Sequence, residues 1–120
     1  MGSIRYIVDD VDAAIAFYQG LLGFTVDMHP APGFAMLSRG DTRLLLNAPG
    51  GGGAGTAGGR PEPGGWNRFQ IEVDDLIAEI DRLRGGGAQF RGEAVEGNAG
   101  RQILVEDPSG NPVELFQGYD

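Results

Sequence analysis

The chain has 120 residues, of which 41% are hydrophobic, and carries a formal net charge of −8 with no cysteine. This size and composition are typical of one globular domain, and no apolar run approaches the length of about 20 residues that a membrane-spanning helix needs. The negative charge argues against nucleic acid as a partner, because phosphate backbones are bound through clustered positive charge. The nine basic residues are all arginine and His29 is the sole histidine, so Schiff-base chemistry at lysine and multi-histidine metal sites are excluded. We expect a cytoplasmic protein whose partner is a neutral or cationic small molecule.

The first part of the chain predicts a strand, a helix and three further strands. Ser3–Val8 alternates apolar and polar residues, as a strand does. Asp9 or Asp10 can cap the next helix, whose apolar residues recur at helical spacing from Val11 to Leu22. Strands are then expected at Phe24–Met28, Phe34–Ser38 and Thr42–Asn47, with a turn at Pro30–Gly33.

The second part of the chain predicts the same series after a glycine-rich stretch at 50–65, which is typical of a flexible linker. Asp74 and Asp75 repeat the pair of acids before a helix. The apolar stripe of that helix consists of Leu76, Ile77, Ile80 and Leu83, and Gly85–Gly87 ends it. Strands are expected at Trp66–Val73, Gln89–Val95, Arg101–Glu106 and Val113–Phe116.

Two pairs of segments indicate that one supersecondary unit occurs twice. Gly40–Leu46 matches Gly110–Phe116, and Val8–Val11 matches Val73–Leu76. The predicted fold class is therefore α+β, with two tandem βαβββ modules that form curved mixed sheets around a cleft and carry their helices on the outer face. We place module one at 1–49, the linker at 50–65 and module two at 66–118, all within a single domain over 1–120.

Glu114 is an acid set among the apolar residues of the last strand. Alternation along the strand places Glu114 and Phe116 on one face and Val113 and Leu115 on the other. A solvent-exposed carboxylate at a sheet edge and a carboxylate that lines a cavity both fit this pattern.

The sequence resembles the vicinal oxygen chelate superfamily, which includes glyoxalase I, extradiol dioxygenases, fosfomycin-inactivating enzymes and bleomycin-type resistance proteins. The resemblance rests on the duplicated βαβββ unit, on Phe17-Tyr18 and Leu22-Gly23-Phe24 around the end of the first helix, and on the closing motif DPSGNPVELF at 107–116. It extends from Ile4 to Gln117. Such motifs are fairly specific for the fold but not for the chemistry.

The resemblance also implies where a metal would lie. In the metalloenzymes of this superfamily the ligands sit on the first and last strands of each copy, at positions that correspond here to Ser3, Leu44, Arg68 and Glu114. Leu44 has no donor atom and Arg68 is a permanent cation, so Glu114 is the one plausible ligand of the four. A catalytic metal usually takes about three protein ligands. We therefore expect no metal and no other cofactor, as in the metal-free antibiotic-binding resistance branch of the superfamily.

The residues around these positions predict a ligand-binding cleft. Arg68 and Glu114 are expected on one concave face, where they can form an ion pair. A mostly apolar lining with a few polar groups is what a small-molecule pocket needs. The candidate ligand-binding residues are Phe34, Met36, Leu44, Leu46, Trp66, Arg68, Gln70, Gln102, Leu104, Glu114 and Phe116. Core packing is the competing interpretation for the aromatic residues Trp66 and Phe116.

Two classes of function fit this pattern. The first is a homodimeric protein that sequesters a small aromatic natural product, such as a bleomycin-type or other cytotoxic antibiotic, and so confers resistance. The second is a lyase or isomerase of the glyoxalase-like fold that uses Glu114 or His29 as a general base. The shortage of metal ligands favours the binding protein.

Overall fold

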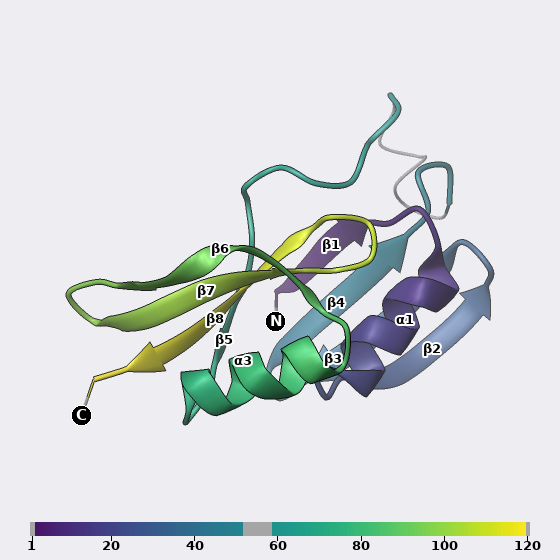
Figure 1. Cartoon of the computed structure of the whole chain (residues 1–120). Coiled ribbons are helices and arrows are strands. Elements are labelled where there is room, and N and C mark those ends of the chain that lie inside the picture. Colours follow the sequence, from purple (N-terminus) through teal and green to yellow (C-terminus); the bar gives the residue numbers. More distant parts are fainter. Residues whose placement is uncertain (1, 52–58, 120) are drawn as a thin grey trace. The chain divides into compact units, whose positions relative to one another are not determined.

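The computed structural model describes residues 2–51 and 59–119. The chain forms two compact units, one made of Met1–Gly64 with Pro108–Asn111 and the other of Gly65–Asp107 with Pro112–Asp120. In the described part of the chain each unit contains one helix and one four-stranded mixed sheet (Figure 1). The predicted α+β class and the repeated order βαβββ are therefore confirmed. Residues 52–58 of the predicted linker lie outside the described residues.

The first unit has the strand order β1-β4-β3-β2, with β1 parallel to β4 and the other neighbours antiparallel. Its elements are β1 (Ser3–Ile7), α1 (Val11–Gly20), β2 (Thr25–Ala31), β3 (Phe34–Arg39) and β4 (Thr42–Asn47). The turn predicted at Pro30–Gly33 is confined to Pro32 and Gly33, because β2 continues to Ala31, which pairs with Phe34. Since β2 is an edge strand, the missing N–H of Pro30 does not interrupt the sheet.

The second unit has the equivalent strand order β5-β8-β7-β6. Its elements are β5 (Gln70–Glu72), α3 (Leu76–Gly85), β6 (Gln89–Glu96), β7 (Gly100–Glu106) and β8 (Pro112–Gly118). The strand predicted over Trp66–Val73 is thus much shorter in the structure. The carbonyl oxygen of Trp66 accepts a hydrogen bond from Arg68 Nη1 at 3.3 Å. At Trp66 the donor to the backbone is therefore a side chain and not the backbone of a neighbouring strand.

Each helix packs an apolar stripe on one face of its own sheet. The buried residues of α1 are Val11, Ala14, Phe17 and Tyr18, and those of α3 are Leu76, Ile80 and Leu83. Ile77, which was predicted to belong to the second stripe, is 60% exposed, because it lies at the edge of that stripe beside a surface pocket. No helix in the described ranges is long and apolar enough to cross a membrane.

The second acid of each predicted pair is the N-cap. Asp10 Oδ1 accepts from Ala13 N, and Asp75 Oδ1 accepts from Ala78 N, both at 3.1 Å. Each cap satisfies a backbone N–H that the first turn of the helix leaves without a partner.

We expect Asp75→Ala to lower the free energy of unfolding by about 1 kcal/mol, because it removes this cap. The matched variant Asp74→Ala removes the same charge from an exposed neighbour and should change the stability very little. Urea unfolding followed by circular dichroism measures both. Equal losses in the two variants would show that charge, and not the cap, is responsible.

The loop Pro108–Asn111, which is part of the closing motif, belongs to the first unit. Buried Asn111 donates from Nδ2 to Ile7 O at 2.8 Å and accepts at Oδ1 from Gly64 N at 2.7 Å. Ser109 Oγ accepts from Asp9 N at 2.8 Å. These polar residues of the motif therefore have a structural role, which is to fix this loop against β1 and the residues that follow it.

Candidate functional site

The backbone hydrogen bonds correct the internal repeat by one residue. Val8 N donates to Asn47 O in the first unit, and Val73 N donates to Phe116 O in the second. Since the two donors correspond, as predicted, their acceptors correspond as well. The offset between matching residues of β4 and β8 is therefore 69 residues and not the predicted 70. The residue that corresponds to Glu114 is Leu45 and not Leu44.

We call the face of each sheet that its helix does not cover the open face. The prediction that Leu44 and Leu46 line this face in the first sheet is wrong. Both are fully buried, and they pair across the sheet with Leu37 and Ala35, which are buried as well. A shift of one residue turns every side chain of a strand to the other face. Leu44 and Leu46 consequently belong to the core under α1, while Leu45 is half-buried on the opposite face.

The error arises from the two hairpin loops, which differ in length. In the first unit the last pair before the turn is Arg39 with Thr42, which leaves two residues between them. In the second unit Glu106 pairs with Pro112, which leaves five. An alignment that pairs Gly40 with Gly110 therefore pairs the residues of β4 and β8 in the wrong register.

Glu114 lies on the open face of the second sheet, where donors occupy both of its carboxylate oxygens. Arg68 Nε donates to Oε1 at 3.1 Å and Arg68 Nη2 lies 3.1 Å from the same atom. Gln70 Nε2 donates to Oε2 at 2.6 Å. The Gln102 amide is assigned with its nitrogen toward Glu114, so that Nε2 donates to Oε1 at 2.8 Å. The predicted ion pair is confirmed, and the Glu114 side chain is 13% exposed.

A pocket of about 290 Å³ lies beside this cluster. The residues that line it are Arg68, Arg91, Gly92, Glu93, Val95, Gln102, Ile103 and Leu104. Of the predicted site residues, Arg68, Gln102 and Leu104 thus lie together. The lining residues from β6 and Ile103 from β7 are not among the predicted site residues.

A bulge in β6 shapes this pocket. Arg91 pairs with Leu104 and Val95 with Gln102, so the chain between Arg91 and Val95 is longer than the facing segment of β7. Gly92 has φ of 81° within the bulge, a conformation that side-chain-bearing residues rarely adopt. A glycine inside a predicted strand is the signal that could have indicated this bulge.

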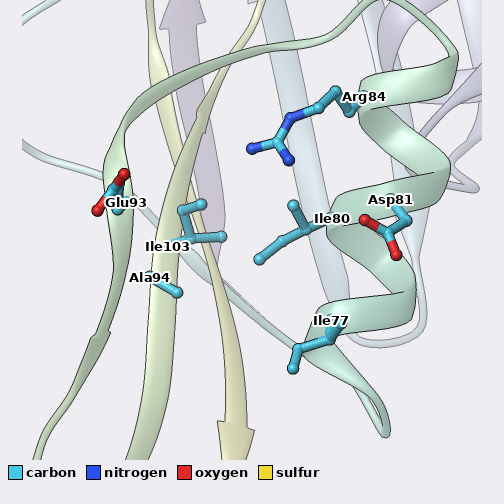
Figure 2. A pocket seen from close by; sticks show the side chains of 7 residues that line it. All are labelled: Ile77, Ile80, Asp81, Arg84, Glu93, Ala94 and Ile103. Carbon is cyan, nitrogen blue, oxygen red and sulfur yellow. The ribbon is translucent and has the colours of Figure 1, made fainter.

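A second pocket, of about 280 Å³, lies between α3 and strands β6 and β7 (Figure 2). The residues that line it are Ile77, Ile80, Asp81, Arg84, Glu93, Ala94 and Ile103. Ile77 and Ile80 point from the helix toward the strands, and the guanidinium of Arg84 lies over the ring of Phe90 at 5.4 Å. Glu93 lines both pockets.

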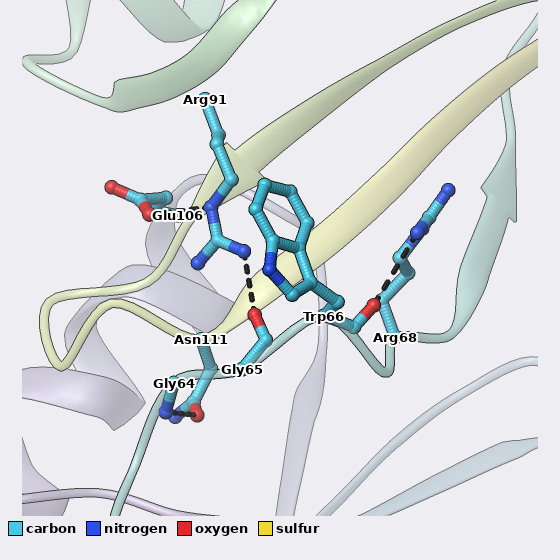
Figure 3. Close-up of polar contacts among 7 residues, drawn as sticks. All are labelled: Gly64, Gly65, Trp66, Arg68, Arg91, Glu106 and Asn111. Atoms are coloured by element: carbon cyan, nitrogen blue, oxygen red, sulfur yellow. Dashed lines mark hydrogen bonds and ion pairs between the residues drawn. The ribbon is translucent and has the colours of Figure 1, made fainter.

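Trp66 forms an exposed aromatic surface that Arg91 supports (Figure 3). The Arg91 guanidinium lies 4.5 Å from the ring centroid, within the range of a cation–π contact. Arg91 is itself held by Glu106 Oε2 at 2.9 Å, and its Nη1 donates to Gly65 O. Trp66 is 68% exposed, so core packing does not explain it.

The remaining predicted residues are half-buried or exposed on the open faces of their own sheets. Phe116 is half-buried on the same face as Glu114 and pairs with Gln102. Phe34 and Met36 are half-buried in β3 of the first unit, and Met36 pairs with Leu45.

The residues at the predicted metal positions do not fit a divalent ion. Glu114 already accepts from Arg68 and Gln70 through its two oxygens, and Arg68 brings a permanent positive charge to the carboxylate. Leu45, which replaces Leu44 in the corrected register, has no donor atom either. Within residues 2–51 and 59–119 no three His, Cys, Asp or Glu side chains are grouped so as to hold a metal.

Comparisons with known proteins agree with this fold. A family model described as the Glyoxalase/Bleomycin resistance protein/Dioxygenase superfamily matches residues 1–115. A Mycobacterium bovis protein named "Putative glyoxylase CFP32" is 36% identical over an alignment 115 residues long, which covers 90% of this chain and 41% of that protein. The chain therefore spans about two fifths of the length of this relative.

Two solved structures have the same fold over almost the whole chain. TnmS3, an antibiotic binding protein from Streptomyces sp. CB03234, is 26% identical with a TM-score of 0.74, covering 99% of this chain and 96% of that one. Lactoylglutathione lyase from Agrobacterium tumefaciens is 22% identical with a TM-score of 0.77, covering 98% and 93%. The second likeness shows the fold alone. With the match over residues 1–115, the chain belongs to the glyoxalase/bleomycin resistance protein/dioxygenase superfamily.

Proposed function

We propose that this chain binds a small aromatic molecule without a metal ion and releases it chemically unchanged. The observation that carries this proposal is the state of Glu114, whose two oxygens accept from Arg68 and Gln70. A carboxylate held in this way is a poor metal ligand, because its lone pairs are in use and a cation already neutralises it. It is a poor general base for the same reason.

The aromatic character of the ligand is supported by Trp66 and the adjacent pocket. The indole is 68% exposed, and Arg91, which covers one side of the ring, also lines the pocket. Leu104 and Val95 add apolar surface there, and Gln102 adds a polar group. An aromatic pair contributes about 0.5–1.5 kcal/mol beyond the burial of its area, so a planar ligand gains from this surface.

We further propose that the ligand is a natural product, that it is an antibiotic, and that sequestration confers resistance. The likeness to TnmS3, an antibiotic binding protein at 26% identity, supports this narrower proposal. A homodimer and a cytoplasmic location complete the proposal and remain predictions.

An enzyme is the second candidate, and the name of the mycobacterial relative favours it. In a lyase or isomerase Glu114 would be the base, and it would have to lose Arg68 or Gln70 before it accepted a proton. His29, the other base considered, lies in the first unit with its Nε2 3.9 Å from Asp12 Oδ1. The pocket beside Glu114 also holds charged groups, because Arg68 and Glu93 line it together with the apolar Val95 and Leu104.

A thermal-shift screen with and without a chelator tests the proposal. Aromatic antibiotics and aromatic metabolites are each added to the protein, and a ligand at a concentration of 100 times its Kd should stabilise it by about 2.7 kcal/mol. We expect the shift to be the same in the presence of EDTA. A shift that disappears with EDTA and returns with added zinc or iron would overturn the metal-free part of the proposal.

A further inference from the structure

The charges around the pocket beside Glu114 do not balance. Arg68 is neutralised by Glu114 at 3.1 Å, and Arg91 is neutralised by Glu106 at 2.9 Å. The side chain of Glu93 lines the same pocket and makes no hydrogen bond or ion pair with any residue that the structure describes. Once Glu114 and Glu106, which do not line the pocket, are counted as the partners of the two arginines, the carboxylate of Glu93 is the one charge of the lining without a partner among the described residues.

The backbone of β6 fixes the position of this carboxylate. Glu93 lies in the bulge between Arg91 and Val95, directly after Gly92, whose φ is 81°. Bulges redirect a side chain that would otherwise follow the alternation of the strand. As a result Glu93 borders the pocket beside Glu114 and also the pocket under α3 (Figure 2).

A third arginine that shares a pocket with Glu93 is Arg84, which lines the pocket under α3. Its guanidinium lies over Phe90, and no ion pair joins it to Glu93 among the described residues. Arg84 does not line the pocket beside Glu114. The carboxylate of Glu93 is thus available to a ligand in that pocket.

We infer that the ligand is a planar aromatic cation, and that Glu93 is the residue which selects its positive charge. This inference rests on the proposed function, since it names the class of molecule that the same pocket takes. A cationic group of the ligand would neutralise Glu93, since Arg68 and Arg91 are already paired with Glu114 and Glu106. The aromatic rings of the ligand would pack on Trp66 beside Arg91.

Equilibrium dialysis with two tricyclic dyes tests the inference. Proflavine is a planar cation at about pH 8, and acridine is a neutral molecule of the same ring system. We expect Glu93→Gln to weaken the binding of proflavine about three- to fivefold, as for a solvent-exposed ion pair, and to leave acridine binding unchanged. Added salt should weaken proflavine binding to the wild type and have less effect on the variant.

Glu96→Gln is the matched control. Glu96 lies on the same strand, pairs with Arg101 at 3.2 Å and lines neither pocket, so its variant changes the net charge by the same amount. If Glu96→Gln weakens proflavine binding as much as Glu93→Gln, the general field of the acidic chain is responsible and the inference fails. If proflavine binds equally to the wild type and to Glu93→Gln, the inference also fails, while the proposed binding function stands. If proflavine does not bind the wild type, the inference fails, and the thermal-shift screen decides the proposed function separately.

Discussion

Leu44→Ala is expected to lower the free energy of unfolding by about 2–5 kcal/mol, because it opens a cavity in a closely packed core. Leu44 is fully buried and lies between Ile4 of β1 and Leu37 of β3. Leu45→Ala removes the same atoms from a half-buried position on the open face and should cost about 1 kcal/mol. The difference between the two variants measures which face each leucine occupies.

Urea unfolding followed by circular dichroism measures both changes. The pair is matched, since the two residues are adjacent in one strand and the substitution is the same. A larger loss for Leu45→Ala than for Leu44→Ala would contradict the register found here and would support the match of Leu44 with Glu114 that the repeat predicts.

Trp66→Ala should weaken the binding of an aromatic ligand about tenfold, which corresponds to about 1.4 kcal/mol. The indole is the exposed aromatic surface beside the pocket, and Arg91 holds its ring at 4.5 Å. The variant loses both the stacking contribution and the apolar area that the ligand would cover. Because Trp66 is largely exposed, the stability of the free protein should change little.

Titration of the tightest ligand from the screen, followed by calorimetry, measures this effect. Trp66→Phe keeps a ring and should recover part of the affinity. Tyr119→Ala is the control, since Tyr119 is an aromatic residue that is 51% exposed in the same unit and lines neither described pocket. Unchanged affinity in Trp66→Ala would remove the indole from the binding surface.

The order of the elements could be predicted from the sequence because each signal is local. Asp10 and Asp75 precede apolar stripes at helical spacing, and both cap helices in the structure. The strands of the second half follow the alternation of their apolar residues, except that β5 retains only Gln70–Glu72. The repeat also predicts Arg68 and Glu114 on one concave face, and the structure pairs them at 3.1 Å although Arg68 precedes β5.

The register and most of the pocket depend on contacts that the sequence does not display. Leu44 was assigned to the wrong face because the two hairpin loops differ in length, and a single slip inverts a strand. The bulge that brings Glu93 to the pocket depends on how β6 pairs with β7. The support of Trp66 by Arg91 likewise depends on a contact between side chains that lie far apart in the sequence.

Recovery of the ligand after incubation tests most directly whether the chain binds without catalysis. The tightest ligand from the screen is incubated in excess over the protein, the protein is then denatured, and the small molecule is analysed by chromatography and mass spectrometry. Binding without chemistry, as the engaged oxygens of Glu114 indicate, predicts an unchanged mass and retention time for all of the recovered ligand. A product of altered mass, or an isomer of altered retention, formed in excess over the protein would contradict this account and would establish an enzyme.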